Sequence, residues 1–295
     1  MNRFGGVKVD LAVDISADVG EGPHWDERTK SLLFVDVTSG TVFRYDPDRD
    51  VVSSFSVGQE VGAAIPRGEG GLVLAVRQGI AVVSDAGGGF DLILPIEADR
   101  PGNRMNDAKC DVRGRLYAGT MAFDFSAGAG ALYRIGTDWS CTQVLSGVTI
   151  ANGMAWSRSG DRLFFIDSGT QGVDVFDFNV ENGEIGNRRR VVSLDKRCGM
   201  PDGMTVDEEG NLWVACFGGG AVRCFSEAGE EVGEIRFPVS QVTSCAFGGP
   251  SLTELYVTSA SYRLGAEELE REPHAGATFV CSPGPTGAGS FIFGG

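Results

Sequence analysis

The stretch SLLFVD, residues 31–36, is the first of six short segments in which a leucine stands among apolar and small side chains. The other five are GLVLAV (71–76), RLYAGT (115–120), RLFFID (162–167), NLWVAC (211–216) and ELYVTS (254–259). Their anchor leucines, from Leu32 to Leu255, follow one another at steps of 40, 44, 47, 49 and 43 residues. A period in the forties, with several strands in each unit, is typical of β-propeller blades.

Turn residues and further strand-like segments surround the six anchor segments. An Asp or Ser followed three residues later by Gly precedes three of them, at 111–114, 157–160 and 207–210, which favours a type I hairpin turn. Outer segments such as VVSSFSV (51–57) complete the units at four strands each. We therefore predict an all-β chain that forms a single six-bladed propeller domain over residues 1–295.

The two ends of the chain are predicted to meet in the last blade. That blade lacks an outer strand, while the N-terminal GVKVDLAVD (6–14) has no blade of its own. Pairing the two closes the ring and leaves no open seam. The segment AEELEREPHAG (266–276) is the one helix-like insertion, and we expect it to form a lid or a rim element.

Composition and charge exclude several classes of function. The formal net charge is -15, so the chain has no general attraction for nucleic acid or an anionic membrane. Two histidines, His24 and His274, are too few for a His-rich zinc site, and no G-x-S-x-G elbow or Walker A loop occurs. The chain shows no signal-peptide core and no membrane-spanning run, and its seven cysteines are dispersed. We expect a reduced, cytoplasmic protein, monomeric or weakly homo-oligomeric, that acts on a small molecule.

About ten residues before each anchor leucine, the first strand of the blade begins. The residues at these six equivalent positions are Glu21, Val61, Asn106, Asn152, Asp202 and Ser244. Innermost strands of a propeller run beside its axis, so equivalent positions form a ring around that axis. Four of the six are hard oxygen donors, two of them charged, which predicts a site for Ca²⁺, Mg²⁺ or Mn²⁺, with Zn²⁺ also able to bind. Taken singly, Asn152-Gly153 and Asp202-Gly203 are also ordinary turn dipeptides.

Two further side chains are candidates for substrate contacts. Arg104 lies two residues before Asn106, where its guanidinium would hold substrate oxygens or form an ordinary surface ion pair. Asp124 follows the anchor strand of the third blade, and we expect it at the rim of the site.

Longer stretches resemble the senescence marker protein/gluconolactonase/regucalcin family over nearly the whole chain. They include EGPHWD (21–26), RMNDAKCDVRGRLYAGTM (104–121), ANGMAWS (151–157), PDGMTVDEEGNLWVACFGGG (201–220), TSCAFGG (243–249) and LYVTSA (255–260). The resemblance implies a six-bladed propeller with one divalent cation on its axis. The residues that it implies are Glu21, Asn152 and Asp202 as metal ligands, Asn106 as a further ligand and substrate contact, and Arg104 and Asp124 as contacts to sugar hydroxyls. Asp124 stands where regucalcin-like members have the longer Glu.

These features predict a metal-dependent lactonase that opens sugar lactones to aldonic acids. The metal would polarise the ring carbonyl, and either Asp202 as general base or a water on the metal would begin the attack. We expect Ca²⁺ as the cofactor, with Zn²⁺, Mg²⁺, Mn²⁺ and Fe²⁺ as alternatives. Two other functions stay open: a phosphotriesterase-like or non-sugar lactone hydrolase that uses the same site, and a non-enzymatic calcium-binding regulatory protein.

Overall fold

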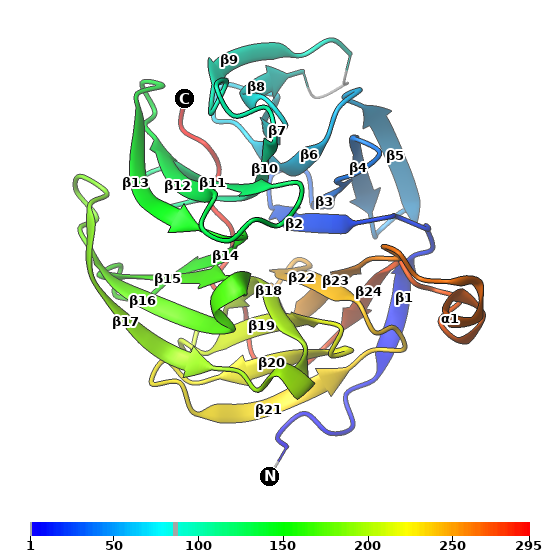
Figure 1. Cartoon of the computed structure of the whole chain (residues 1–295). Coiled ribbons are helices and arrows are strands. Elements are labelled where there is room, and N and C mark those ends of the chain that lie inside the picture. The colour runs from blue at the N-terminus through cyan, green and yellow to red at the C-terminus, as the bar shows by residue number, and fades with distance from the viewer. Residues whose placement is uncertain (1, 85–87) are drawn as a thin grey trace.

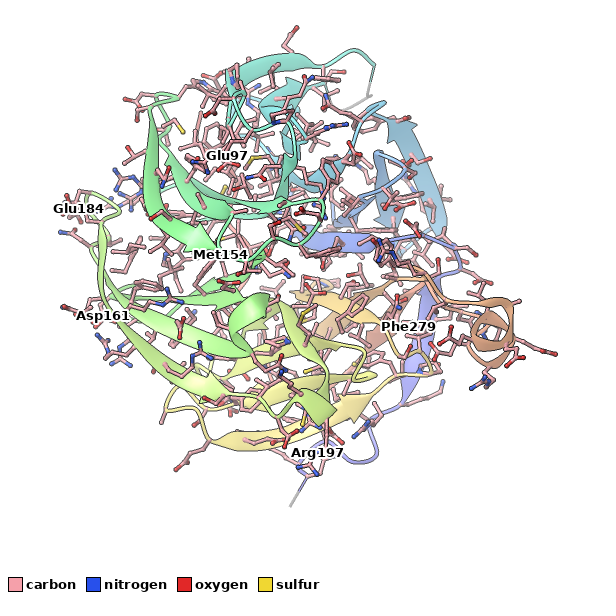
Figure 2. The ribbon with its side chains drawn as sticks, in the orientation of Figure 1. Glu97, Met154, Asp161, Glu184, Arg197 and Phe279 are labelled. Carbon is pink, nitrogen blue, oxygen red and sulfur yellow. The ribbon has the colours of Figure 1, made fainter. Side chains whose placement is uncertain are left out.

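The strands of this chain form a ring of blades around a central axis (Figure 1). The structure, a computed structural model, describes residues 2–84 and 88–295. Within those residues it contains six antiparallel sheets of four strands each, which confirms the predicted six-bladed propeller. Figure 2 shows Met154 close to the centre of the ring and Asp161, Glu184 and Arg197 at its periphery, as expected when the apolar residues pack between blades.

Blades 1 to 3 each run in chain order from an innermost strand to an outermost strand. Blade 1 consists of β2 (Gly20–Asp26), β3 (Ser31–Asp36), β4 (Thr41–Asp46) and β5 (Val51–Ser56). Blade 2 consists of β6 (Val61–Pro66), β7 (Leu72–Val76), β8 (Gly79–Val83) and β9 (Asp91–Pro95). Blade 3 consists of β10 (Asn103–Cys110), β11 (Leu116–Ala122), β12 (Gly130–Ile135) and β13 (Cys141–Val148).

Blades 4 and 5 repeat this order, and blade 6 differs in its outermost strand. Blade 4 consists of β14 (Ala151–Trp156), β15 (Arg162–Asp167), β16 (Gly172–Phe178) and β17 (Ile185–Ser193). Blade 5 consists of β18 (Met200–Val206), β19 (Leu212–Phe217), β20 (Ala221–Phe225) and β21 (Glu231–Arg236). Blade 6 consists of β22 (Val242–Gly248), β23 (Glu254–Ser259), β24 (Thr278–Cys281) and β1 (Val9–Val13).

The N-terminal strand closes the ring, as the sequence predicted. In the antiparallel pair of β1 and β24, Val9 lies opposite Cys281 and Leu11 lies opposite Phe279. Hydrogen bonds between the first and last parts of the chain therefore complete blade 6, and the seam lies at the outer edge of a blade. A propeller closed in this way has no unpaired innermost strand.

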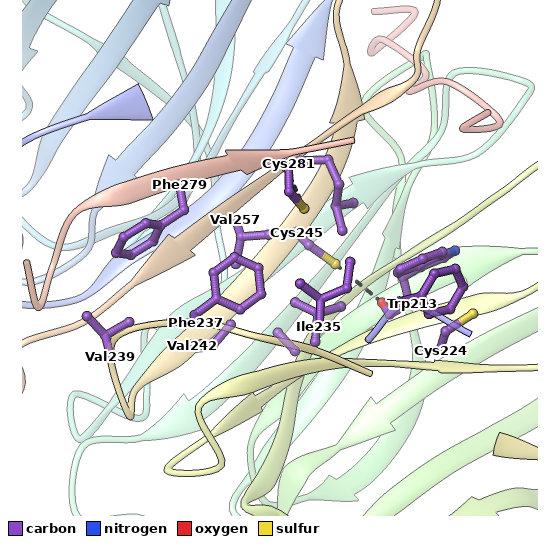
Figure 3. Close-up of a cluster of buried hydrophobic side chains, with 14 of the residues drawn as sticks. Trp213, Cys224, Ile235, Phe237, Val239, Val242, Cys245, Val257, Phe279 and Cys281 are labelled. Atoms are coloured by element: carbon purple, nitrogen blue, oxygen red, sulfur yellow. Dashed lines mark hydrogen bonds between the residues drawn. The ribbon is translucent and has the colours of Figure 1, made fainter. Parts of the chain in front are cut away.

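The anchor segments are apolar because each is covered on both faces by neighbouring blades. Every residue of β3 is buried, whereas β5 at the outer edge of the same blade is almost entirely exposed. Clusters of large side chains fill the spaces between blades. In the cluster drawn in Figure 3, the rings of Phe237 and Phe279 lie 5.8 Å apart, and Cys245 Sγ donates to the carbonyl of Trp213.

The three predicted turns before the anchor strands are present. In each, the glycine has a positive φ and its N–H donates to the carbonyl of the first turn residue. The pairs are Asp111 and Gly114 (2.9 Å), Ser157 and Gly160 (2.9 Å), and Asp207 and Gly210 (3.0 Å).

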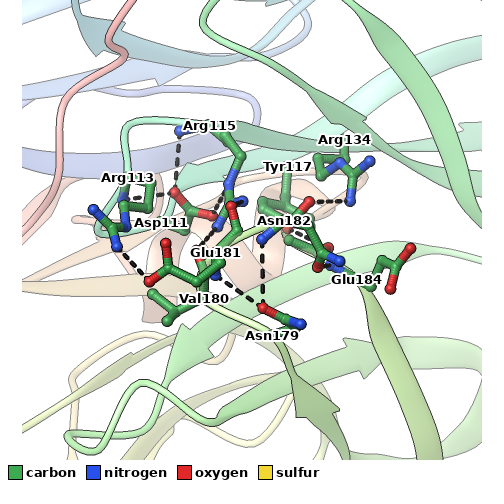
Figure 4. Close-up of polar contacts among 11 residues, drawn as sticks. Asp111, Arg113, Arg115, Tyr117, Arg134, Asn179, Val180, Glu181, Asn182 and Glu184 are labelled. Carbon is green, nitrogen blue, oxygen red and sulfur yellow. Dashed lines mark hydrogen bonds and ion pairs between the residues drawn. The ribbon is translucent and has the colours of Figure 1, made fainter.

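Buried polar contacts join blade 3 to the hairpin between β16 and β17 of blade 4 (Figure 4). Arg115 Nε donates to Asp111 Oδ2 at 2.7 Å, and Arg115 Nη2 donates to the carbonyl of Val180, also at 2.7 Å. Tyr117 Oη donates to the carbonyl of Gly183 at 2.8 Å. These contacts join the two neighbouring blades away from the axis, toward the outer edge of the ring.

The C-terminal segment, residues 282–295, crosses the end of the axis where the innermost strands finish (red in Figure 1). The N–H of Gly287 donates to the carbonyl of Leu252, and the N–H of Phe293 donates to the carbonyl of Pro66, the last residue of β6. The side chain of Phe293 is fully buried. This segment covers one end of the axis and leaves the opposite end for a site.

The predicted helix-like insertion is the short helix α1 (Ala266–Arg271), which projects from the outer edge of the ring (Figure 1). Tyr262 and Arg263, just before it, line the cavity described below. In the part of the chain that the structure describes, no helix has the length and apolar character needed to cross a bilayer.

Candidate metal and substrate site

The innermost strand of each of the six blades shifts its register with the adjacent strand near its start, and in four of them the shift lies at a predicted oxygen-bearing residue. In β2, β10, β14 and β18, the register with the adjacent strand shifts at or beside Glu21, Asn106, Asn152 and Asp202 respectively. A bulge leaves its extra residue out of the regular pairing and changes the direction of the side chain. The four oxygen-bearing side chains all line one cavity.

The glycines that follow two of these residues are needed for close packing between blades. A Cβ on Gly153 would lie 2.7 Å from the carbonyl oxygen of Asp202, and a Cβ on Gly203 would overlap the Ser244 hydroxyl. Both glycines lie inside strands, and neither has a positive φ. The Asn-Gly and Asp-Gly pairs are therefore strand residues, and the alternative interpretation as turns is wrong.

The cavity has a volume of about 450 Å³ and opens at the end of the axis where the innermost strands begin. Glu21, Arg104, Asn106, Asn152 and Asp202 are among the residues that line it. Glu21, Asn152 and Asp202 are only 8%, 5% and 7% exposed, so they form the deep part. The structure brings together five of the six residues predicted from the sequence.

In blades 2 and 6, the residue found by counting along the sequence does not line the cavity. Val61 is fully buried and is not among the lining residues. In blade 6, Thr243 lines the cavity in place of Ser244, because the hairpin between β22 and β23 is longer: Leu255 pairs with Phe247, eight residues earlier, whereas Leu32 pairs with Trp25, seven residues earlier, and this shifts the count by one residue. Counting residues back from the anchor leucine does not show this shift.

Hydrogen bonds connect the polar side chains across three blades. Arg104 Nη1 donates to Asn106 Oδ1 at 2.8 Å, and Asn106 Nδ2 donates to Asn152 Oδ1 at 2.8 Å. Asn152 Nδ2 donates to Ser168 Oγ at 2.8 Å, and Ser168 Oγ donates to the carbonyl of Pro201 at 2.6 Å. Arg104 therefore forms its hydrogen bonds within the site, and it is not a residue that only pairs with a surface carboxylate.

Burial, with smaller contributions from neighbouring carboxylates, raises the pKa of both carboxylates in the cavity. Burial, followed by the charge of Asp107, raises the pKa of Glu21 to about 8. Burial and the charges of Glu21 and Asp107 raise the pKa of Asp202 well above its usual range. The charge of Arg104 acts in the opposite direction on both groups and is outweighed. A cation bound between two such carboxylates would favour their ionised forms.

The donors fit one divalent cation that prefers oxygen. Two carboxylates and two side-chain amides are hard ligands of the kind that Ca²⁺ and Mg²⁺ take, with water completing the shell. Among residues 2–84 and 88–295, no three His, Cys, Asp or Glu side chains are grouped so that they alone could hold a metal ion. An ion at this site would therefore depend on the amide oxygens of Asn152 and Asn106 as well as on Glu21 and Asp202.

A family model described as the SMP-30/gluconolactonase/LRE-like region matches residues 19–261. The chain belongs to this family. Regucalcin from Gallus gallus is 39% identical over 279 residues, which cover 92% of this chain and 93% of that protein. Regucalcin from Homo sapiens is 35% identical with the same coverage of both chains.

Solved structures show the same fold in the family. A luciferin-regenerating enzyme superposes with a TM-score of 0.92 at 34% identity, covering 98% of this chain and 100% of that one. A regucalcin from Agrobacterium tumefaciens, described as a calcium-binding protein, also has a TM-score of 0.92 but is only 24% identical, with 98% and 97% of the two chains covered. This second likeness shows the fold alone.

Two residues of interest lie outside the cavity. Asp124 is exposed in the turn after β11, where its Oδ1 accepts from the N–H of Ser126 at 3.0 Å. Its neighbours Phe123 and Phe125 line the cavity mouth, so Asp124 as a substrate contact stays a prediction. His24 is buried away from the cavity lining, and burial lowers its pKa to about 4.

Apolar side chains make up much of the cavity wall, and the sequence did not indicate them. They are Val19, Val37, Met121, Phe123, Phe125, Ile150, Met200, Phe217 and Tyr262. They come from several blades and stand outside the repeat positions that carry the ligands. A repeat count therefore could not have gathered them into one wall.

Proposed function

We propose that this member of the family is a lactone hydrolase that uses one divalent cation, Ca²⁺ in the first instance. Glu21, Asn152 and Asp202 would hold the cation, with Asn106 beside them. The observation that carries the proposal is the meeting of two buried carboxylates, both with raised pKa values, at the base of an open cavity. The family description, which includes gluconolactonase, supports it.

A cation held there would polarise the lactone carbonyl and stabilise the negative charge that develops on its oxygen. Asp202 is the proposed general base, which takes a proton from a water as the water oxygen bonds to the carbonyl carbon. The bond from that carbon to the ring oxygen then breaks, and the ring oxygen receives the proton. The product is the open hydroxy acid. Arg104, which can only donate hydrogen bonds, would orient substrate oxygens.

Sugar lactones are the proposed substrates and aldonic acids the products. Besides Arg104 and Asn106, the cavity is lined by Thr38, Glu60 and Arg263, which offer donors and acceptors for hydroxyl groups. Burial and the charge of Glu21 raise the pKa of Asp202 in the metal-free protein and so favour its protonated form, whereas a bound cation would favour the ionised base.

A second substrate class is favoured by the apolar wall. Side chains such as Phe123, Phe125, Met121 and Phe217 would bury the substituent of a non-sugar lactone, an aryl ester or a phosphotriester. A cavity of about 450 Å³ lies in the range that holds drug-sized ligands. This class would use the same ligands and the same base.

Acid release from a panel of substrates tests both classes. Chelator-stripped protein is mixed with glucono-1,5-lactone, pentonolactones, an alkyl-substituted δ-lactone, phenyl acetate and a phosphotriester in a weakly buffered indicator solution. Each is measured without metal and with Ca²⁺, Mg²⁺, Mn²⁺, Zn²⁺ or Fe²⁺. The variants are Asp202→Ala and, as a matched control, Asp10→Ala, whose side chain is exposed on β1 and forms an ion pair with Lys8.

We expect metal-restored hydrolysis of sugar lactones that Asp202→Ala loses and Asp10→Ala keeps. Preferential hydrolysis of the alkyl lactone or the phosphotriester would show that the substrates belong to the second class and are not sugar lactones. Folded protein that hydrolyses nothing above the spontaneous rate with any of the five metals would refute the hydrolase and leave calcium-dependent regulation to be tested.

A further inference from the structure

Ser168 does not line the cavity, yet its hydroxyl accepts a hydrogen bond from the side chain of Asn152 and donates one to the carbonyl of Pro201. It begins the short helix η1 (Ser168–Thr170), directly after β15, and is 1% exposed. The preceding Asp167 accepts from the N–H groups of Ile150 and Gly169, both at 3.1 Å. These bonds hold Ser168 against the start of β14, the strand that carries Asn152.

The Ser168 hydroxyl has a single proton, and that proton is used. It is donated to the carbonyl of Pro201 at 2.6 Å. Toward Asn152, the Ser168 oxygen can then only accept, and it does so from Nδ2 at 2.8 Å. A side-chain amide that directs its NH₂ group to Ser168 must direct its carbonyl oxygen away from it.

The hydrogen bonds of Asn106 require the same orientation of Asn152. Arg104 has no acceptor, so Asn106 must present Oδ1 to it, at 2.8 Å. Asn106 Nδ2 is then left to donate to the carbonyl of Ala151 and to Asn152 Oδ1, each at 2.8 Å. A carbonyl oxygen has two lone pairs, so Asn152 Oδ1 keeps one for a further partner in the cavity.

We propose that Ser168 is a positioning residue that sets the affinity of the site for its cation. It keeps the carbonyl oxygen of Asn152, and not the NH₂ group, available to the ion. Through the Pro201 carbonyl it also ties that amide to β18, one residue before Asp202. This inference rests on the proposed metal site. Without the hydroxyl, Asn152 Nδ2 loses its acceptor, and only the bond from Asn106 Nδ2 still holds the carbonyl oxygen of Asn152 in this orientation.

The loss of such an outer partner typically lowers metal affinity by about 10–100-fold. The test is calorimetric titration of chelator-stripped Ser168→Ala with Ca²⁺ and with Mn²⁺, together with the Tm of the metal-free protein. Ser259→Ala is the matched control. Ser259 is fully buried in blade 6, donates to the carbonyl of Ala277 at 2.6 Å and accepts from the N–H of Gly276 at 3.1 Å.

We expect Ser168→Ala to raise the Kd for Ca²⁺ by about 10–100-fold, whereas Ser259→Ala stays within about twofold of the wild-type Kd although its Tm falls comparably. If Ser168→Ala does not fold, Ser168→Cys tests the proposal instead. The cysteine sulfur is a weaker hydrogen-bond donor and acceptor than the serine oxygen, so this variant should have a Kd between those of the wild type and of a protein without the hydroxyl.

Three outcomes would overturn the proposal: a folded Ser168→Ala protein with the wild-type Kd, a Ser168→Cys protein with the wild-type Kd, or equal weakening in the Ser259→Ala control. A wild-type protein that binds neither Ca²⁺ nor Mn²⁺ would refute the metal site and this inference together. Wild-type binding that the Ser168 variants share unchanged would refute this inference alone.

Discussion

Raising the pH from 6 to 9 is expected to strengthen the binding of Ca²⁺ to the metal-free protein by about a hundredfold. Glu21 must lose its proton to act as a ligand, and its pKa in the folded, metal-free protein is about 8. A group with that pKa is ionised in about one molecule in a hundred at pH 6 and in about nine in ten at pH 9. The raised pKa of Asp202 acts in the same direction.

Calorimetric titration at four pH values between 6 and 9, in two buffers of different ionisation enthalpy, measures the Kd and counts the protons released on binding. Glu21→Gln is the control, since its side-chain oxygen can still accept from the N–H of Gly22, a contact of 2.7 Å. It should bind more weakly, with a smaller pH dependence. His24, with a pKa of about 4, does not titrate in this range. A Kd equal at pH 6 and pH 9, without proton release, would refute the reasoning.

The remaining predictions concern stability, turnover and substrate binding. Because the folded protein raises the pKa of Glu21 above its unfolded value, metal-free protein should lose stability as the pH rises through about 8. Its Tm should be lower at pH 9 than at pH 6, and Ca²⁺ should raise the Tm more at pH 9; a scanning fluorimetry result of the opposite sign would contradict this. Asp202→Asn should lower kcat by roughly 10²–10⁴-fold and weaken Ca²⁺ binding, as steady-state kinetics and calorimetry would show, and near-normal kcat would exclude Asp202 as the base. Arg104→Ala should mainly raise KM, and Arg104→Lys should not restore it, because a lysine lacks the planar fork of donors. Asp124→Ala should raise KM less than Arg104→Ala does, because its carboxylate accepts a hydrogen bond within its own turn; an equal rise for each lactone would show that Asp124 reaches the substrate. Gly203→Ala should destabilise the fold by about 1–3 kcal/mol in urea denaturation, because the added Cβ would overlap the hydroxyl of the neighbouring blade, and an unchanged midpoint would show that the blades can separate there.

Much of the fold follows from local information along the chain. Three of the anchor segments combine a turn glycine such as Gly114 with an apolar strand such as β11, and both are properties of a few adjacent residues. The regular spacing of six such segments indicates the number of blades. The unpaired apolar segment at the N-terminus predicts its own place, because the last blade would otherwise present an open edge.

The candidate site could be predicted only as far as the repeat extends. Equivalent positions in the blades indicate Glu21, Asn106, Asn152 and Asp202, and all four line the cavity. The same count gives Ser244 in blade 6, where the cavity is lined by Thr243, because the hairpin between β22 and β23 is one residue longer than the hairpin between β2 and β3, and only the strand pairing shows this difference.

The sequence by itself determined the strand pattern, the number of blades and the oxygen donors at the axis, since each depends on residue type and spacing. Only the tertiary structure decided that Ser168 orients Asn152, that apolar side chains from several blades form one wall, and that the C-terminal segment covers the far end of the axis. The physical reason is that these contacts join segments from different blades. Their partners are set by how the blades pack and by the register of each sheet, and neither is a periodic property of the chain.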